Sequence, residues 1–171
     1  MQQFNSQNST IFYGYGKTPF GEALIAFTDK AVCYFWFLDN NTDDIFHEFS
    51  SFYKDARLFR DDNKAAKYLE DIFVKNKKCK LLVKGTAFQI SVWRVLLGIR
   101  AGEVVTYKDI ANKIKRPTAV RAVANAIGKN HIAYLIPCHR VIAKNGAISG
   151  YRWGLERKRN LLDYESKQVA F

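Results

Sequence analysis

The sequence predicts an α+β protein of two domains, residues 1–81 and 82–171, on three observations. The chain has 171 residues, 48% hydrophobic and 25% charged, a globular composition that suffices for two small domains. The first 81 residues carry 11 Lys and Arg against 11 Asp and Glu, and the remainder carries 16 against 5, so the net charge of +11 lies in the second part. The pattern of apolar residues also changes: the first part predicts a hairpin and two helices, and the second part predicts several short helices.

A basic domain beside a neutral one indicates a polyanionic partner, because Lys and Arg that neutralise phosphates release condensed counterions. A basic surface that only confers solubility would give the same charge balance. Charge alone therefore leaves a nucleic acid and the absence of any specific partner as open alternatives.

Residues 1–81 predict an α/β domain. After a polar N-terminal tail, FGEALIAFTDKAVCYFWFLD (20–39) consists of two apolar runs broken by Asp-Lys, the pattern of a β-hairpin. Two helical patterns follow, and in the clearer one Asp61 and Asp62 are cap candidates. The apolar face of this helix comprises Ala65, Leu69, Ile72 and Phe73. The charged stretch KNKKCK (75–80) marks the junction with the second domain.

The second domain begins with three helices. Thr86 is expected to cap the first, which runs to about Ile99, and Thr106 begins the second. After the tight turn KRP, the third is expected over residues 117–127 or 118–127, ended by a glycine. Two short helices around a three- or four-residue turn fit a helix-turn-helix.

A hairpin and a last helix complete the second domain. Asn145-Gly146 lies between two apolar runs of VIAKNGAIS, the strongest short-range hairpin signal. A helix-turn-helix followed by a hairpin gives a winged-helix outline. The last helix is expected from about Leu155 to Glu165, with Leu155, Leu161 and Leu162 packed inward.

The third helix, PTAVRAVANAIG, is unusual for a helix that reads DNA in the major groove, because its side chains are small apart from Arg121. Small residues let a backbone approach another surface closely. That surface could be the protein core, which is the plainer interpretation. It could equally be a narrow minor groove, with Arg121 as a wedge where the duplex opens.

Three widely spaced cysteines, Cys33, Cys79 and Cys138, argue against a disulfide framework and for a reduced, cytoplasmic compartment. With three histidines and no CxxC pair, no metal site is expected. The N-terminus lacks a basic start followed by an apolar run, and the longest apolar stretch, AVCYFWFL (31–38), is too short to span a bilayer. We therefore expect a soluble, unexported protein without a membrane partner.

Cys138, in AYLIPCHRVIAKNG, differs from the other two cysteines because His139 and Arg140 follow it. Cysteines are mostly buried as small hydrophobes, and Cys33 fits that description. Positive charge or an imidazole nearby favours the thiolate, which is the nucleophilic form. Neighbours on an extended strand point to opposite faces, so contact with His139 requires a bend that Pro137 could set. Spacing alone leaves a nucleophile and a buried thiol as alternatives.

Four motifs together carry a family resemblance. IPCHRVI, with GTAFQISVWRVL and GEVVTYKDIA before it and ISGYRWGLERKRNLLDYE after it, resembles the O6-alkylguanine-DNA alkyltransferases, also called methylated-DNA–protein-cysteine methyltransferases. The motifs occur in family order over residues 85–165. The first domain matches only in length and in its hairpin-and-helix outline, which resembles the ribonuclease-H-like N-terminal domain of that family.

The resemblance implies direct DNA repair. A member of this family binds duplex DNA containing O6-alkylguanine through a helix-turn-helix in the minor groove and flips the damaged base into a pocket. It then takes the alkyl group irreversibly onto its own cysteine, so each molecule reacts once. The resemblance leaves open whether O4-alkylthymine is also a substrate. No cofactor and no obligate protein partner are implied, and the protein is expected to be a monomer.

The resemblance also implies residue roles. Cys138 matches the alkyl acceptor, His139 the residue that deprotonates it through a water, and Glu165 the carboxylate that orients the histidine. Tyr107 matches the tyrosine that aids flipping and helps neutralise the leaving guanine. By residues alone, Glu165 would be an ordinary acid near a helix C-terminus, where the helix dipole disfavours its charge.

Further positions match the DNA-binding and pocket residues of the family. Arg121 corresponds to the arginine that replaces the flipped base in the stack. The expected DNA-binding residues are Thr118, Ala119, Arg121, Ala122, Asn125 and Ala126. The expected pocket residues are Tyr107, Asn130, Val141, Tyr151, Arg152 and Trp153. Asn130 would brace the turn before the active-site strand, and the carbonyls of Cys138 and Val141 with the amide of Arg152 would recognise the guanine edge.

Three departures from the family pattern stand out. IRAGE, with Arg100, replaces the IP that many members carry before GE, which predicts a changed loop. The zinc ligands of some animal members have no counterparts. Trp153 stands where some members have glycine, so we expect a narrowed pocket.

Two other functions are alternatives to alkyl transfer. A non-catalytic DNA-binding module that flags alkylated bases would lack the acceptor cysteine. A cysteine hydrolase using Cys138 and His139 would need an oxyanion site that the sequence does not indicate, and it would leave the basic helix-turn-helix unexplained.

Overall fold

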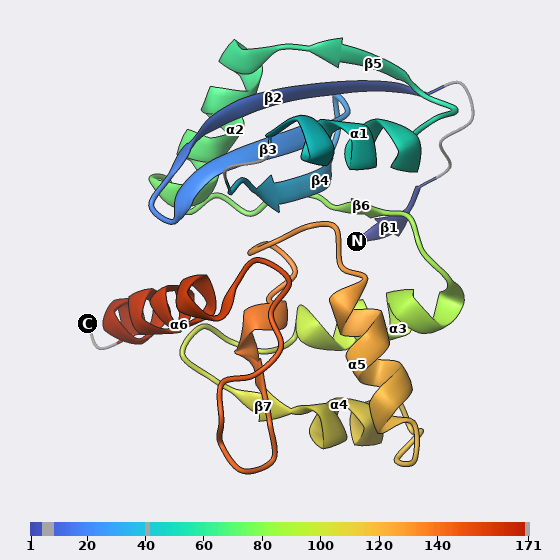
Figure 1. Cartoon of the computed structure of the whole chain (residues 1–171), viewed down its shortest axis with the longest axis vertical. Helices are drawn as coiled ribbons and strands as arrows, with labels where there is room; N and C mark the ends of the chain where they lie inside the picture. Colours follow the sequence, from blue (N-terminus) through green and yellow to red (C-terminus); the bar gives the residue numbers. More distant parts are fainter. Residues whose placement is uncertain (5–8, 40–41, 170–171) are drawn as a thin grey trace. The chain divides into compact units, whose positions relative to one another are not determined.

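The computed structural model describes residues 1–4, 9–39 and 42–169, which form two compact units, Met1–Lys84 and Gly85–Phe171 (Figure 1). The sequence predicts a boundary between residues 81 and 82. Together the units make a mixed α+β protein.

The first unit is built on a four-stranded sheet with the order β4-β3-β2-β5. Strands β2 (Thr10–Thr18), β3 (Gly21–Phe27) and β4 (Val32–Phe37) are antiparallel, and β5 (Arg57–Arg60) pairs in parallel with β2. A separate pair joins β1 (Gln2–Gln3) and β6 (Leu82–Val83). The two helices are α1 (Thr42–Phe52) and α2 (Asp62–Phe73).

The two helices cover opposite faces of this sheet. Tyr13 of β2 contacts Phe46 and Phe49 of α1. Its neighbour Gly14 faces α2, where a Cβ on the glycine would lie 2.7 Å from Cβ of Ala65. Because successive residues of a strand point to opposite faces, these contacts place α1 and α2 on the two sides of the sheet. Figure 1 shows the sheet between them.

The sequence anticipated part of this unit. The hairpin of β3 and β4 is confirmed, as is α2 with Asp61 as its N-cap, whose Oδ1 accepts a hydrogen bond from the Lys64 backbone at 2.9 Å. The four residues predicted for its inner face are the four that are buried. Strand β2 was missed, because it starts in the polar tail and because Gly14 and Gly16 interrupt the apolar alternation. Strand β5 was missed as well.

The described part of the second unit contains four α-helices: α3 (Ala87–Leu96), α4 (Tyr107–Lys113), α5 (Val120–Gly128) and α6 (Leu155–Val169). A single 3₁₀ turn, η1, spans Cys138–Arg140. Strands β7 (Val105–Thr106) and β8 (Val141–Ile142) pair in parallel. Within the described ranges of the chain, no helix is both long enough and apolar enough to cross a membrane.

The predicted helix starts are confirmed for α3 and α4. Thr86 and Thr106 each form a capping box. The threonine hydroxyl accepts a hydrogen bond from the backbone amide of the residue three positions later, Gln89 or Asp109. The side chain of that residue accepts one from the backbone amide of the threonine. Helix α3 ends three residues before the predicted Ile99. Helix α5 begins at Val120, not at residue 117 or 118, and its cap residue Ala119 makes no side-chain bond.

The hairpin predicted after Cys138 is wrong. Residues 143–147 form a tight turn, with backbone bonds from Ala143 N to Ala147 O (3.1 Å) and from Gly146 N to Ala143 O (3.0 Å). No second strand follows, because the Ser149 carbonyl is taken by the Lys158 ammonium and Gly150 has the left-handed φ of 54°. The segment that would be a wing is therefore a loop.

Helix α6 buries only part of the predicted apolar set. Leu161 is fully buried, as expected, and Leu162 is half-buried. Leu155 is 41% exposed, so its predicted inward packing is wrong. It is the first residue of α6, where the preceding Gly154, with a φ of 88°, turns the chain into the helix.

Candidate functional site

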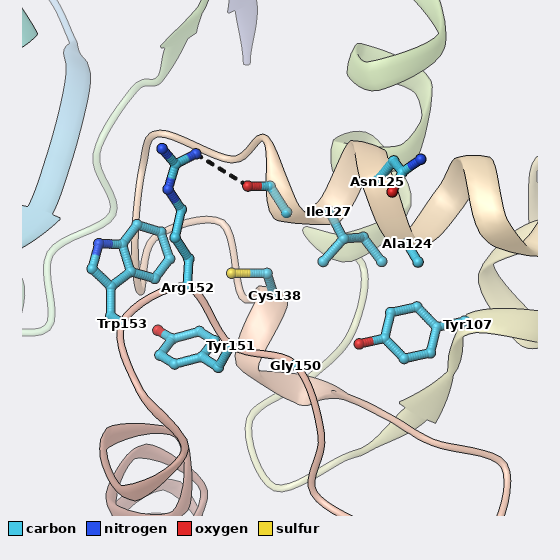
Figure 2. A pocket seen from close by; sticks show the side chains of 10 residues that line it. Tyr107, Ala124, Asn125, Ile127, Cys138, Gly150, Tyr151, Arg152 and Trp153 are labelled. Carbon is cyan, nitrogen blue, oxygen red and sulfur yellow. Dashed lines mark hydrogen bonds between the residues drawn. The ribbon is translucent and has the colours of Figure 1, made fainter. Parts of the chain in front are cut away.

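A pocket of about 310 Å³ lies in the second unit, and Cys138 is in its wall (Figure 2). Its walls come from α4, α5, η1 and the loop before α6. The lining residues are Tyr107, Ala124, Asn125, Ile127, Gly128, Cys138, Gly150, Tyr151, Arg152 and Trp153. Of the predicted pocket residues, Tyr107, Tyr151, Arg152 and Trp153 line it. Asn130 and Val141 are buried and do not line it.

Cys138 is 4% exposed and begins the turn η1, so it lies in a bend and not on an extended strand. Pro137 precedes it with φ −79° and ψ 63°, which supplies the bend. Burial raises the pKa of the Cys138 thiol to about 11, although a hydrogen bond from Asn130 and the charge of Lys158 both act to lower it. The resting site therefore holds a neutral thiol.

Asn130 fixes the segment that connects α5 to η1. Its Nδ2 donates to the carbonyls of Ile132 (3.1 Å) and Ile136 (3.2 Å) and approaches Cys138 Sγ at 3.3 Å. Its Oδ1 accepts from the backbone of Ile132 at 2.9 Å. The buried side-chain amide of Asn130 thus holds this segment by three hydrogen bonds and also contacts the Cys138 thiol.

His139, Arg140 and Glu165 form a buried charge cluster. His139 Nε2 lies 2.7 Å from Glu165 Oε1, and Arg140 donates from Nε to Oε2 (2.8 Å) and from Nη2 to Oε1 (2.7 Å). Burial raises the pKa of Glu165, but the hydrogen bonds from His139 and Arg140 outweigh that effect and hold it at about 2. Glu165 is therefore a carboxylate at neutral pH and can only accept hydrogen bonds.

The carboxylate fixes the tautomer of His139. Because Glu165 only accepts, the ring hydrogen must be on Nε2, which leaves the lone pair on Nδ1. Nδ1 is buried, and no group in the described part of the chain bonds to it. Burial lowers the pKa of His139, so the ring is neutral and Nδ1 can act as a base.

Lys158 was missed by the sequence analysis and is fully buried. Its ammonium donates to the carbonyls of Val141 (2.5 Å) and Ser149 (2.7 Å), joining β8 to the pocket loop. Burial lowers the pKa of Lys158 to about 8. The spacing of Lys158, Leu161 and Glu165 places all three on one face of α6, and this signal could have indicated an inward lysine.

Helix α5 is amphipathic, so some of its small residues pack in the core and others face solvent. Val123, Ala126 and Ile127 are buried, while Arg121, Ala122 and Asn125 are exposed, together with the preceding Thr118. Ala119 is half-buried.

The predicted DNA contact of Ala126 is wrong. This residue is 3% exposed, because the Trp93 indole nitrogen of α3 donates to the Ala126 carbonyl at 2.9 Å and holds that side of α5 inward.

The pocket walls are largely aromatic. The rings of Tyr151 and Trp153 pack with centroids 5.2 Å apart, and Tyr151 also contacts the edge of His139. Tyr107 lies on α4, close enough to Gly150 that a Cβ there would come within 3.3 Å of its hydroxyl. Burial raises the pKa of Tyr107, and nearby Cys138 adds to this effect. Its phenol is therefore a hydrogen-bond donor at neutral pH.

Comparison with known proteins shows similarity over nearly the whole chain. Residues 87–167 match the family described as 6-O-methylguanine DNA methyltransferase, DNA binding domain. The inducible methylated-DNA–protein-cysteine methyltransferase of Bacillus subtilis is 38% identical over 149 residues, which cover 84% of this chain and 83% of that protein. The regulatory protein Ada of Salmonella typhimurium is 37% identical over an alignment of 179 positions, which covers 98% of this chain.

The chain spans only about half the length of two curated relatives. It covers 49% of the Salmonella protein and 47% of the Ada protein of Escherichia coli. Among solved structures, OGT of Mycobacterium tuberculosis in complex with DNA is 32% identical with a TM-score of 0.74. That similarity covers 92% of this chain and 94% of the other.

Proposed function

Because the chain belongs to the O6-methylguanine-DNA methyltransferase family, we propose that it repairs DNA by moving the alkyl group of O6-alkylguanine onto Cys138. The observation that carries the proposal is a buried thiol in the wall of a pocket, next to an imidazole whose free nitrogen is fixed by a carboxylate. O4-alkylthymine is a second substrate to test. The reaction needs no cofactor.

The thiol must lose its proton before it can attack. With a pKa of about 11, roughly one Cys138 in ten thousand would be a thiolate at pH 7. In the proposed mechanism, Nδ1 of His139 takes the proton through a bridging water, and Glu165 stabilises the imidazolium. The sulfur then forms a bond to the alkyl carbon as the bond from that carbon to O6 breaks.

The atoms balance without a co-reactant. The guanine leaves with the electron pair of the broken bond and receives one proton, for which the Tyr107 hydroxyl in the pocket wall is the proposed donor. The proton taken from the thiol replaces it, so the products are S-alkylcysteine and unmodified guanine. A thioether is stable, so each molecule reacts once.

The proposed base-recognition groups are backbone atoms. The carbonyls of Cys138 and Val141 would accept from the guanine edge, and the amide of Arg152 would donate to it. A carbonyl oxygen has two lone pairs, and Lys158 occupies one of those on Val141. This lysine also fixes the direction in which the carbonyl points.

DNA binding is assigned to the exposed face of α5. Its small side chains Ala122 and Asn125 permit close approach to a minor groove, and Arg121 would fill the space left by the flipped base. We also propose the ribonuclease-H-like description for the first unit and the winged-helix-like description for the second. The wing would then be a loop in place of a hairpin.

The three cysteines are free in the structure, which supports action in a reducing, cytoplasmic compartment. We propose that the protein acts as a monomer without an obligate protein partner.

The experiment that tests the proposed function is mass spectrometry of the intact protein after incubation with duplex DNA carrying O6-methylguanine. The expected result is a gain of one methylene unit, mapped to the peptide that contains Cys138, with a yield that never exceeds one per molecule. Repeated turnover, or the absence of an adduct, would contradict the proposal.

Replacing Arg121 by alanine should slow repair of duplex DNA by about tenfold while sparing reaction with the free modified base, because the wedge acts only when a base is flipped. Single-turnover rates on the two substrates provide the measurement. Arg159→Ala removes the same charge from an exposed position on α6 and is the control. An equal loss of rate on both substrates would contradict the proposed role of Arg121 as a wedge.

Trp153 should make the protein slower on O6-benzylguanine than on O6-methylguanine, because the buried indole occupies one wall of the pocket. Trp153→Gly is expected to raise the ratio of benzyl to methyl rates by about tenfold. Rates are compared only after thermal unfolding shows that the variant is folded, since loss of a buried tryptophan destabilises a domain by about 3–5 kcal/mol. Equal rates for the two adducts in the unmodified protein would refute the prediction.

A further inference from the structure

Another cavity, of about 440 Å³, lies in the first unit. Its volume is within the range of about 300–1,000 Å³ that is typical of small-molecule sites. The walls come from the turn between β3 and β4, from α2 and from the segment that follows α2. The lining residues are Asp29, Lys30, Ala31, Tyr68, Asp71, Lys77, Lys78, Cys79 and Lys80. Because four of the nine are lysines, we call it the lysine cavity.

Both carboxylates of the lysine cavity are already paired with cations. Oδ1 of Asp29 lies 3.2 Å from the Lys64 ammonium. Oδ1 of Asp71 lies 3.1 Å from the ammonium of Lys77 and 3.2 Å from that of Lys75. The hydrogen bonds from Lys77 and Lys75 lower the pKa of Asp71, so this group is a carboxylate at neutral pH. Of the four lining lysines, only Lys77 is therefore paired with an acid of the cavity.

The other three lining lysines have no counter-charge. Within residues 1–4, 9–39 and 42–169, no ion pair involves Lys30, Lys78 or Lys80, and all three are exposed. The first 81 residues carry equal numbers of cationic and acidic side chains, 11 of each. The positive charge at the cavity is thus a local concentration within a neutral part of the chain.

The shape and chemistry of the cavity favour an anion that carries several charges. The ring of Tyr68 forms part of the wall and stacks on Phe27, with the ring centroids 4.4 Å apart. A concave surface with an apolar wall and charges of one sign focuses the electric field and concentrates counter-ions. An ammonium binds phosphate as a point charge. A ligand with one carboxylate would neutralise one of the three lysines, whereas successive phosphate groups can neutralise all of them.

We propose that the lysine cavity is a binding site for a chain of phosphate groups, supplied by the backbone of a DNA strand or by a free polyphosphate. The proposal concerns the first unit alone and does not depend on alkyl transfer to Cys138. It gives this unit a ligand-binding role in addition to its packing.

Cys79 reports whether the lysine cavity is occupied, because it lines the cavity and is half-exposed. The test is the rate at which iodoacetamide modifies Cys79, followed by peptide mass spectrometry with and without a probe. The two probes are inorganic tripolyphosphate and a short duplex of undamaged DNA. Burial already raises the pKa of the thiol. A phosphate bound beside it should raise the pKa by about one unit more and slow modification about tenfold.

A variant without the three unpaired lysines should lose this protection. In Lys30→Gln/Lys78→Gln/Lys80→Gln, which we call the cavity variant, saturating probe should change the rate at Cys79 by less than twofold. The comparison is made within each protein, with and without probe, because the substitutions themselves alter the field at the thiol. The variant should remain folded, since all three side chains are exposed.

A matched control removes the same charge from exposed lysines of the first unit outside the lining. The control variant is Lys17→Gln/Lys54→Gln/Lys67→Gln. It should keep the tenfold protection. Protection by tripolyphosphate, alone or together with the duplex, identifies a site open to free polyphosphate, and protection by the duplex alone identifies the DNA backbone as the source. If neither probe protects Cys79, or if protection persists in the cavity variant, the proposal is overturned.

Discussion

Replacing Cys138 by alanine should abolish methyl transfer from O6-methylguanine DNA, leaving no adduct on the protein at any incubation time. The substitution removes the only described cysteine in the wall of the pocket, and no other lining residue is a comparable nucleophile. The fold should survive, because the change removes one buried sulfur and its 3.3 Å contact with Asn130. A cost of about 1 kcal/mol in unfolding free energy is expected.

The two remaining cysteines provide matched controls for that experiment. Cys33→Ala leaves the hydrogen bond from the Tyr53 hydroxyl intact, because that bond goes to the backbone carbonyl of Cys33. Cys79→Ala changes a half-exposed residue. Both variants should accept one methyl group per molecule, as the unmodified protein does. An adduct in Cys138→Ala would place the acceptor elsewhere in the chain.

Replacing Glu165 by glutamine should slow methyl transfer by roughly 100-fold, the size of effect expected when a general base is lost. Glutamine has nearly the same shape, but its amide can donate to His139 Nε2 and thereby favour a hydrogen on Nδ1. In the proposed mechanism, Nδ1 could then no longer take the proton of the thiol. The imidazolium would also lose its counter-charge. Single-turnover rates with duplex O6-methylguanine measure the effect.

The same substitution should lower the free energy of unfolding by about 3 kcal/mol at pH 7, because Arg140 loses the carboxylate that it binds with two hydrogen bonds. The pKa of Glu165 is depressed in the folded protein from 4.5 to about 2. Its stabilisation is therefore fully present above pH 4.5 and is lost as the pH falls towards 2. Between pH 4.5 and pH 2, the Glu165→Gln variant should therefore lose less unfolding free energy than the unmodified protein.

Glu156→Gln is the control for both measurements, because it makes the same substitution at an exposed site in the first turn of α6. It should change neither rate nor stability appreciably. If Glu165→Gln repairs DNA as fast as this control, the carboxylate does not orient the base.

Local sequence signals predicted those elements whose stability is decided locally. The caps at Asp61, Thr86 and Thr106 need only residues within one helical turn, and all three are confirmed. Strand β2 could not be predicted in this way. Its glycines weaken the strand pattern, and they are explained only by the close approach of α2, a contact between segments about 50 residues apart.

The second unit shows the same limit. Asn145-Gly146 predicted a turn correctly, but a hairpin also needs a second strand, and the residues after the turn bond to Lys158 instead. Ala126 was assigned to the DNA surface because small residues look alike on either face of a helix. The Trp93 contact from α3 decides its orientation, and no local pattern contains that information.

The candidate site was predicted by family resemblance more than by residue patterns. Residue spacing predicted that Cys138 and His139 are neighbours. It could not predict that Glu165, 26 residues after His139, lies beside them. The structure places His139 and Glu165 at 2.7 Å and adds Arg140 and Lys158, whose side chains the motifs did not assign. Buried cations of this kind are visible only once the backbone carbonyls that bind them are in place.

The position of Glu165 and Lys158 on α6 has a consequence for biosynthesis. Cys138 is translated before both, so a growing chain contains the acceptor sulfur before it contains the carboxylate that sets the histidine tautomer. In the proposed mechanism, the thiol is an ordinary cysteine until α6 has been made and has folded onto η1. The proposed site is therefore complete only after most of the second unit has been synthesised, and an unfinished chain would not react at Cys138.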